Sequence, residues 1–282
     1  MELGVTIFLT DKTMPITDLA RAVEERGFES LWFAEHTHIP VSRATPYPMG
    51  GELPDEYRRT FDPFVTIAAA AAVTERIKLG TAICLVAQHD TIDLAKSVAS
   101  VDRLSNGRFL FGVGYGWNVE EMEDHGVDHK RRRAIVREKL LAARELWTKD
   151  EASFEGEHVR LSASWMWPKP VQQPHPPILF GGAPGPKLFR EIVELGDGWI
   201  PIGGRGLREA LPELRRLMEE AGREPDALDV TTVGVTPDSV DKLRHYESLG
   251  VSRVVFFLPS SGADAVLPLL DRYTNDFLAV LR

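Results

Sequence analysis

The chain has 282 residues, of which 43% are hydrophobic, and a formal net charge of −9 at pH 7. The acidic total disfavours a general nucleic-acid surface, because phosphate binding needs a basic field, and no apolar run approaches the roughly 20 residues that a membrane span needs. From the N-terminal residues we expect no signal peptide. The single cysteine, Cys84, excludes an intramolecular disulfide, and we therefore expect a reducing, cytoplasmic location.

Short β-branched runs alternate along the chain with longer stretches of helical periodicity. The runs that predict strands lie at 3–9, 30–34, 77–86, 108–114, 176–182, 198–202, 228–234 and 252–258. The stretches that predict helices lie at 15–26, 62–74, 91–104, 131–148, 186–195, 207–221, 238–249 and 263–280. Eight strand–helix units is the number that closes a barrel, so we predict one α/β domain over residues 1–282 with a (β/α)8 TIM-barrel fold. A doubly wound open sheet is the alternative.

Two insertion segments break this alternation. Residues 36–61 follow the second strand and are rich in proline, glycine and aromatic residues. Residues 149–176 precede the fifth strand and contain Trp165, Trp167 and a predicted hairpin around 155–158. Long segments of this kind often cover a site. Because the first segment leaves the carboxyl end of a strand, we expect it on the catalytic face of the barrel.

The second predicted strand ends in FAEHTH, which places Glu35, His36 and His38 where barrel enzymes carry their chemistry. A histidine there can shuttle a proton near neutral pH. Metal binding is a rival interpretation, but no further histidine or cysteine stands at ligand spacing, so no metal site is expected. A structural role as hydrogen-bonded loop histidines is the other alternative.

Glycines mark two further strand ends. The fourth strand ends in GVGYGWN, whose glycines let a backbone approach a ligand or let barrel layers pack tightly. The fifth ends in LFGGAPGPK, where Gly181, Gly182 and the following helix N-terminus predict a phosphate site, with Lys187 in the first turn. The small residues that end the third strand, LGTAICLV, either form a shelf for a flat ring or simply pack the barrel.

Covalent hydrolysis is disfavoured. The chain has no G-x-S-x-G elbow, no P-loop motif and no convincing Ser-His-Asp constellation. Cys84 lies within an apolar run, where a thiol keeps a high pKa and makes a poor nucleophile.

The motifs resemble a known family when they are taken in order. SLWFAEHTH, TERIKLGTAICLV, DRLSNGRFLFGVGYGWN, ILFGGAPGPK and GDGW are similar to the luciferase-like oxidoreductases, and most similar to the branch that uses the deazaflavin coenzyme F420. The resemblance covers roughly the first 205 residues and is most specific over 102–117. It implies a (β/α)8 barrel with insertions, which agrees with the strand count.

The resemblance also implies site residues. The acid–histidine pair of the F420 enzymes falls on Glu35 and His36 as catalytic residues; the family's usual acid is Asp, and Glu35 is one methylene longer. A non-prolyl cis peptide that supports the deazaflavin would fall between Ala82 and Ile83. The remaining cofactor-binding positions are Gly114, Gly116, Asn118, Gly181, Gly182 and Ala183, with Arg43, Arg58, Arg59 and Lys187 as candidate partners for the anionic cofactor tail.

The expected function is hydride transfer between F420, or its reduced form, and a small organic substrate. An FMN-dependent monooxygenase that uses reduced flavin and oxygen is the first alternative, and a cofactor-binding protein without catalysis is the second. The resemblance implies a homodimer. The sequence leaves the substrate open, although the segment at 36–61 and the region of Trp165 and Trp167 are expected to shape its site.

Overall fold

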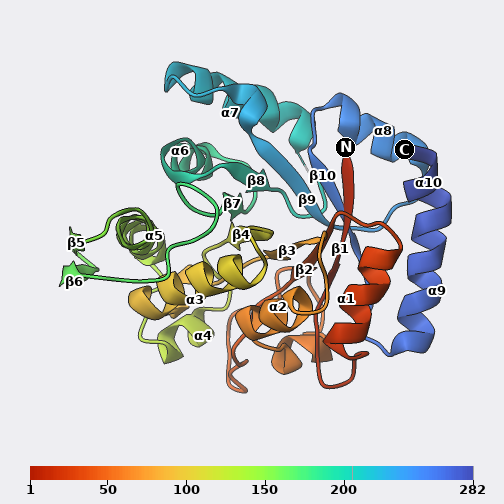
Figure 1. Ribbon diagram of the computed structural model, residues 1–282, viewed down its shortest axis with the longest axis horizontal. Coiled ribbons are helices and arrows are strands. Elements are labelled where there is room, and N and C mark those ends of the chain that lie inside the picture. Colours follow the sequence, from red (N-terminus) through yellow and green to blue (C-terminus); the bar gives the residue numbers. More distant parts are fainter. Residues whose placement is uncertain (205, 282) are drawn as a thin grey trace.

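Eight parallel strands close into a barrel in the computed structural model, which describes residues 1–204 and 206–281 (Figure 1). The barrel strands are β1 (Glu2–Ile7), β2 (Ser30–Phe33), β3 (Lys78–Thr81), β4 (Phe109–Val113), β7 (Ile178–Gly181), β8 (Gly198–Ile200), β9 (Asp229–Val235) and β10 (Arg253–Phe257). Each strand pairs in parallel with its neighbour along the chain, and β1 also pairs with β10. The predicted TIM barrel is confirmed, and the open-sheet alternative is wrong.

The helices surround the barrel. They are α1 (Ile16–Glu25), α2 (Pro63–Ala71), α3 (Thr91–Leu104), α4 (Val119–Asp124), α5 (Arg132–Thr148), α6 (Pro186–Leu195), α7 (Leu207–Glu220), α8 (Val240–Ser248), α9 (Ala263–Tyr273) and α10 (Ala279–Leu281). Short 3-10 turns lie at Asp55–Arg59, Val86–Gln88 and Pro225–Ala227, and a π-helical turn at Thr274–Leu278 interrupts the last predicted helix. The sequence did not predict α4. The predicted run at 77–86, a strand that leads into a loop, is β3 followed by the irregular residues 82–85.

Local capping explains where the helices begin. The Asp62 carboxylate accepts a hydrogen bond from the N–H of Val65 at 2.8 Å, and Pro63 occupies the first turn of α2. The Asp90 carboxylate accepts from the first N–H groups of α3 in the same way. These bonds satisfy donors that the helix itself leaves unpaired.

A layer of large apolar side chains fills the barrel interior. Its members are Trp32, Leu110, Leu179, Ile200, Val233 and Val255. The indole of Trp32 fits because β3 carries Gly80 beside it: a Cβ atom at Gly80 would lie 2.3 Å from the ring. The barrel is therefore packed at its centre, and its chemistry is confined to the ends.

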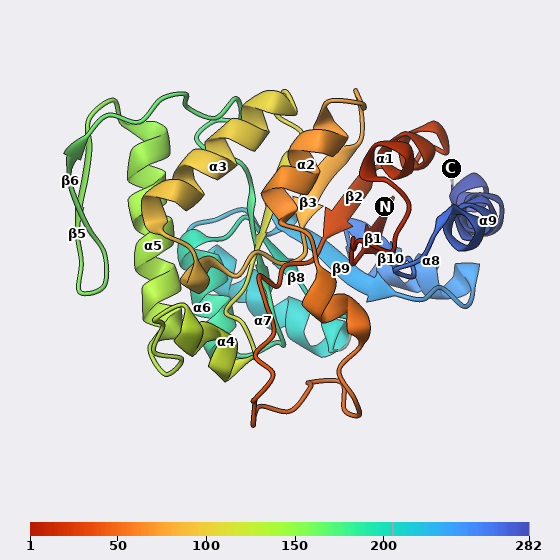
Figure 2. The ribbon, with the colours of Figure 1, turned by 90° about the horizontal axis from the view of Figure 1, so that it is seen from below.

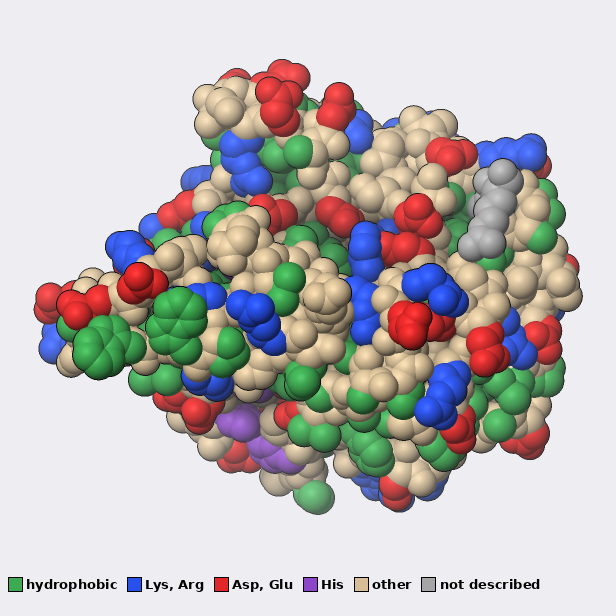
Figure 3. All heavy atoms as spheres, in the orientation of Figure 1, with side chains coloured by type: hydrophobic (Ala, Val, Ile, Leu, Met, Phe, Trp, Pro, Cys, Tyr) green, Lys and Arg blue, Asp and Glu red, His purple; other side chains and the backbone are tan. Residues whose placement is uncertain are grey.

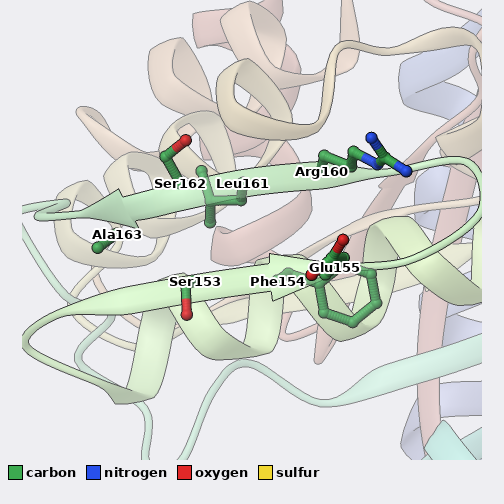
Figure 4. A pocket seen from close by; sticks show the side chains of 7 residues that line it. All are labelled: Ser153, Phe154, Glu155, Arg160, Leu161, Ser162 and Ala163. Carbon is green, nitrogen blue, oxygen red and sulfur yellow. The ribbon is translucent and has the colours of Figure 1, made fainter.

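The two insertion segments lie on different parts of the molecule. Residues 36–61 and helix α4 sit at the same end of the barrel, beyond the carboxyl ends of the strands (Figure 2). We call this end the mouth. The predicted hairpin exists as β5 (Ala152–Glu155) and β6 (Arg160–Ser164), which pair antiparallel and pack against α5. A hollow on this hairpin lies away from the mouth, so it does not belong to the barrel site (Figure 4).

The surface is mixed in charge. Acidic and basic side chains are interspersed over the face seen in Figure 3, without a continuous basic field. Within the described residues, no helix combines the length and apolarity needed to cross a membrane.

Candidate active site

A buried histidine–carboxylate pair lies at the mouth, between the segment after β2 and helix α4. The Nδ1 atom of His36 lies 2.8 Å from one carboxylate oxygen of Glu121 and 3.1 Å from the other. His36 is 7% exposed and Glu121 is fully buried. An ionised carboxylate only accepts hydrogen bonds, so we assign the proton to Nδ1, which donates to Glu121. Nε2 is then left to take or give a proton.

Sequence reasoning missed Glu121. The residue stands 85 positions from His36, and its short helix was not predicted. The available signal is the acid-rich run VEEMED directly after GVGYGWN, in which Glu121 and Met122 form the buried side. His36 and Glu121 meet because barrel closure brings the carboxyl ends of β2 and β4 to the same mouth.

Three aromatic side chains lie beside this pair, and we call Tyr47, Tyr57 and Trp117 the aromatic wall. The ring centroids of His36 and Tyr57 are 5.1 Å apart, and those of His36 and Trp117 are 5.8 Å apart. Tyr47 and Tyr57 come from the 36–61 segment and Trp117 from the segment between β4 and α4. The 36–61 segment therefore reaches the site, as its position after β2 predicts.

The contacts of Glu35 are with Leu85 and His89. Its carboxylate accepts the N–H of Leu85 at 2.5 Å and lies 2.7 Å from Nε2 of His89. Burial opposes its charged form, but the bonds from His89 and Leu85 outweigh that cost and lower the pKa of Glu35. Cys84 is buried beside it, and desolvation together with the Glu35 charge raises the pKa of the thiol. Glu35 is thus held by Leu85 and His89, and its role as a catalytic residue stays a prediction.

Glu35, Cys84 and His89 also form a potential metal-ligand group, since their ligand atoms lie within 4.8 Å of one another. Glu35 and His89 are already within hydrogen-bond distance of each other, at 2.7 Å. The sequence prediction that the chain carries no metal site stays a prediction.

The Glu35–His89 pair should make stability depend on pH. Burial lowers and the Glu35 contact raises the pKa of His89, with a net upward shift from its ordinary 6.5. The pKa of Glu35 is lowered from 4.5. The contribution of Glu35 to the free energy of unfolding is thus lost as pH falls below 4.5. The contribution of His89 is lost as pH rises above 6.5. We expect Glu35→Gln to reduce the free energy of unfolding by about 1.5–3 kcal/mol, the range for a hydrogen bond to a charged group.

Urea unfolding at pH 5.5 and pH 8.5 measures this effect. The loss in Glu35→Gln should be larger at pH 5.5, where His89 is charged. Glu52→Gln, at an exposed position of the 36–61 segment, is the matched control. An equal loss at both pH values would contradict the assignment of an ion pair.

A shelf of small and apolar residues follows β3. The Ala82–Ile83 peptide bond is cis, at the position that the resemblance implied. Ala82 and Ile83 pack against the apolar layer inside the barrel. A Cβ atom at Gly114 would lie 1.8 Å from Ile83 Cδ1, and one at Gly181 would lie 2.7 Å from Ile83 Cγ2. These two glycines make room for Ile83, so the barrel-packing alternative explains their lack of side chains.

Two amide side chains near Gly116 have buried polar atoms without a hydrogen-bond partner among the described residues. Asn118 is 1% exposed, and both of its polar side-chain atoms are unpaired, as are those of Gln88. Gly116 has a left-handed φ of 75°, and a Cβ atom placed there would lie 3.7 Å from Nε2 of Gln88. Buried amides without partners are costly, so this pair of side chains is suited to a polar ligand.

The predicted phosphate loop borders a cationic hollow. The hollow has a volume of about 440 Å³ and is lined by residues 183–188, Arg133 and Arg190. Lys187 and Arg190 form no ion pair within the described residues, whereas Arg133 pairs with Glu191. The N–H of Gly182 already donates to the Ile200 carbonyl at 3.2 Å. An anion would therefore have to use donors from Ala183 onward.

Of the other candidate cations, Arg43 forms no ion pair among the described residues, whereas Arg58 and Arg59 are engaged elsewhere. Arg58 and Arg59 both bond the Asp55 carboxylate, and Arg59 also reaches Asp11. His38 is partly exposed and contacts Asp124 of α4 at 3.0 Å. These contacts hold the 36–61 segment in place. None of them joins Arg58, Arg59 or His38 to the shelf residues Ala82 and Ile83.

The fold is a (β/α)8 barrel, and barrels of this kind carry catalysis at the carboxyl ends of their strands. The histidine–carboxylate pair and the unpaired amides lie at these ends, so fold and site together are those of an enzyme. The chain belongs to the family described as luciferase-like monooxygenase, whose model matches residues 9–252.

Relatives of known sequence include both uncharacterized proteins and F420-dependent ones. The uncharacterized protein Rv0953c of Mycobacterium tuberculosis is 44% identical over 280 residues, covering 96% of this chain and 97% of the relative. The F420-dependent glucose-6-phosphate dehydrogenase of Nakamurella multipartita is 30% identical over 224 residues, covering 76% of this chain and 60% of that protein. F420 dependence is thus present among the relatives.

Solved structures support the same fold. The monooxygenase RslO1 from Streptomyces bottropensis superposes with a TM-score of 0.79 at 19% identity, with full coverage of both chains. An F420-dependent secondary alcohol dehydrogenase in complex with an F420–acetone adduct superposes with a TM-score of 0.77 at 17% identity, covering 99% of each chain. At such identities the likeness establishes the barrel alone.

Proposed function

We propose that this chain is an oxidoreductase that transfers a hydride between coenzyme F420 and a small organic substrate, with His36 as the proton donor or acceptor. The observation that carries the proposal is the buried His36–Glu121 pair at the mouth. Glu121 holds the ring through Nδ1, so that Nε2 can exchange a proton with the substrate. Glu35 holds the segment that bears the shelf and acts as a positioning residue.

The residues at the mouth fit the cofactor. Asn118 and Gln88 offer unpaired amides for its polar groups, and Lys187 with Arg190 offers positive charge for its phosphate and anionic tail. Ala82 and Ile83 offer an apolar surface for its flat ring. When bound, F420 supplies a carbon that donates or accepts a hydride and does not activate oxygen. The protein then has to orient the substrate and manage one proton.

Parallel titration with F420 and FMN tests the proposal. We expect quenching of F420 fluorescence at micromolar concentrations and much weaker binding of FMN. Tight FMN binding without F420 quenching would favour the alternative of a flavin monooxygenase. Binding of F420 with no turnover in a broad reductase screen, and no effect of His36 variants, would favour a protein without catalysis.

Replacement of Asn118 gives a sharper result. In the cofactor-free chain the Asn118 side chain makes no hydrogen bond, so Asn118→Ala should leave the unfolding temperature nearly unchanged. Loss of one hydrogen bond to the cofactor, about 1–1.5 kcal/mol, should raise the dissociation constant for F420 roughly tenfold. Asn275→Ala, on the exposed C-terminal π-helical turn, is the control. A destabilised Asn118→Ala protein with unchanged F420 affinity is incompatible with this role.

The homodimer and the cytoplasmic location are also part of the proposal. Light scattering after size-exclusion chromatography measures the first, and a mass of one chain would disprove it. A tagged copy followed by cell fractionation measures the second.

A further inference from the structure

The aromatic wall is one packed cluster. The ring centroids of Tyr47 and Tyr57 are 5.2 Å apart. The ring centroid of Trp117 lies 6.1 Å from that of Tyr47 and 6.3 Å from that of Tyr57. The two tyrosine hydroxyls are 3.2 Å apart, within hydrogen-bond distance. All three side chains are half-buried, and two of them contact the ring of His36. The three rings meet edge to face, with interplanar angles of 66° to 78°. The surface next to His36 is therefore aromatic, angled and partly open.

The charges around this wall are negative. Helix α4 carries the carboxylates of Glu120, Glu121, Glu123 and Asp124 within six residues. Glu120 accepts the N–H groups of Ala44 at 2.6 Å and Thr45 at 3.1 Å, which ties α4 to the segment that holds Tyr47. An anion beside His36 would face this field in a site of reduced dielectric.

Few lysine or arginine side chains lie near the aromatic wall, and most of these are already paired with carboxylates. Lys12, Arg58 and Arg59 converge on the carboxylate of Asp55. Arg43 is the one lysine or arginine between residues 36 and 57, against the four acids of α4. Unpaired cations line the hollow at residues 183–190 instead. The mouth is thus divided into a cationic side that suits phosphate and an aromatic side that does not.

We propose that the aromatic wall selects uncharged substrates that carry an aromatic or other flat apolar group next to the reacting carbon. This inference rests on the proposed function. Because the two rings are inclined by 78°, a flat group that stacks on Trp117 meets Tyr57 edge to face, and this pair of contacts orients the substrate with its reacting oxygen towards Nε2 of His36. The wall and the acids of α4 together exclude phosphorylated and carboxylated molecules.

The reaction balances for a ketone. In the reductive direction a hydride from reduced F420 forms the new C–H bond, the carbonyl π pair moves to oxygen, and oxygen takes a proton from His36. The reduced cofactor also gives up one ring N–H proton, which restores the His36 proton through solvent. The sum is F420H2 plus ketone giving F420 plus alcohol.

Acetophenone and 4-acetylbenzoate are matched probes, because they differ by one carboxylate. Ligand-observed NMR with oxidised F420 measures their binding without turnover, and F420H2 oxidation measures kcat and KM. We expect acetophenone to bind at least tenfold more tightly than 4-acetylbenzoate. Glucose 6-phosphate, the substrate in the name of the Nakamurella relative, should not be turned over.

Variants of the wall test its role. Trp117→Leu should raise KM for acetophenone about fivefold to tenfold through lost stacking while the F420 dissociation constant stays the same. Trp165→Leu, at a 79% exposed tryptophan of the other insertion, should change neither value. Glu123→Lys, at an exposed position of α4, should improve 4-acetylbenzoate binding about twofold to fivefold at low salt and leave acetophenone unaffected.

The outcomes separate the two proposals. Failure to bind F420 would refute the proposed function. F420 binding with equal or stronger affinity for 4-acetylbenzoate, or turnover of glucose 6-phosphate, would overturn the substrate class and leave the proposed function standing. A Trp117→Leu protein that binds F420 normally and keeps the parent KM for acetophenone would overturn the role of the wall.

Discussion

Replacement of His36 by Asn is expected to lower kcat for the hydride transfer by about 10²–10⁴-fold, the usual contribution of a positioned acid or base. Asn retains a polar contact for Glu121 but cannot exchange a proton, so binding of F420 should change much less than turnover. Glu121→Gln replaces the carboxylate that accepts from Nδ1 of His36 with an amide and so loosens the orientation of the ring. We expect a loss of kcat smaller than that of His36→Asn.

The double variant distinguishes a working pair from two independent residues. If Glu121 acts only through His36, the His36→Asn/Glu121→Gln protein should be about as slow as His36→Asn alone. His38→Asn is the matched control, because His38 lies two residues along, is partly exposed and contacts Asp124. Multiplicative losses in the double variant, or an equal loss in His38→Asn, would refute the pairing.

Arg253→Ala is expected to have the largest effect on stability, a loss of about 3–5 kcal/mol in the free energy of unfolding. Arg253 is 3% exposed at the end of the barrel opposite the mouth. Its guanidinium donates to Glu29 at 2.6 Å and 2.8 Å, to Asp229 at 3.0 Å and to Thr231 at 2.7 Å. Truncation would leave Asp229 without this counter-ion and Glu29 with Lys78 alone, at 3.0 Å.

The loss of stability caused by Arg253→Ala should depend on pH. Burial opposes ionisation of Glu29, but the hydrogen bonds and charge of Arg253 lower its pKa from 4.5 to about 2. A lowered carboxyl pKa gives stability that is present above 4.5 and lost as pH falls towards 2. The difference between parent and Arg253→Ala in denaturant unfolding should therefore shrink between pH 6 and pH 3.

Arg216→Ala is the control for this prediction. Arg216 pairs with Glu213 and Glu220 on the exposed surface of α7, where ion pairs contribute little. Its denaturation midpoint should stay close to that of the parent. A small effect of Arg253→Ala that does not vary with pH would refute a structural role for the buried cluster.

Some features of the site were available from sequence because they depend on short-range order. The motif after β2 identified His36, the cis peptide fell at Ala82–Ile83, and the 155–158 turn formed its hairpin. The cofactor roles stay predictions, although the unpaired amide of Asn118 supports one of them. They concern His36, Ala82, Ile83, Gly114, Gly116, Asn118, Gly181, Gly182 and Ala183.

Other features required the folded chain. The direction of Glu35, the pairing of His36 with Glu121 and the ion pairs of Arg58 and Arg59 join residues from different elements. The lack of a side chain at Gly114 has its reason in Ile83, which reaches it from the neighbouring strand end.

The sequence by itself determined the barrel, because alternating β-branched runs and helical periodicity are local properties, and eight strand–helix units have a closed parallel sheet as their favoured arrangement. It also determined which strand ends carry histidine, glycine and positive charge. Tertiary structure alone decided which of those groups meet. A side chain's direction and partner depend on residues far away in the chain, such as Glu121 for His36, and no periodicity records them.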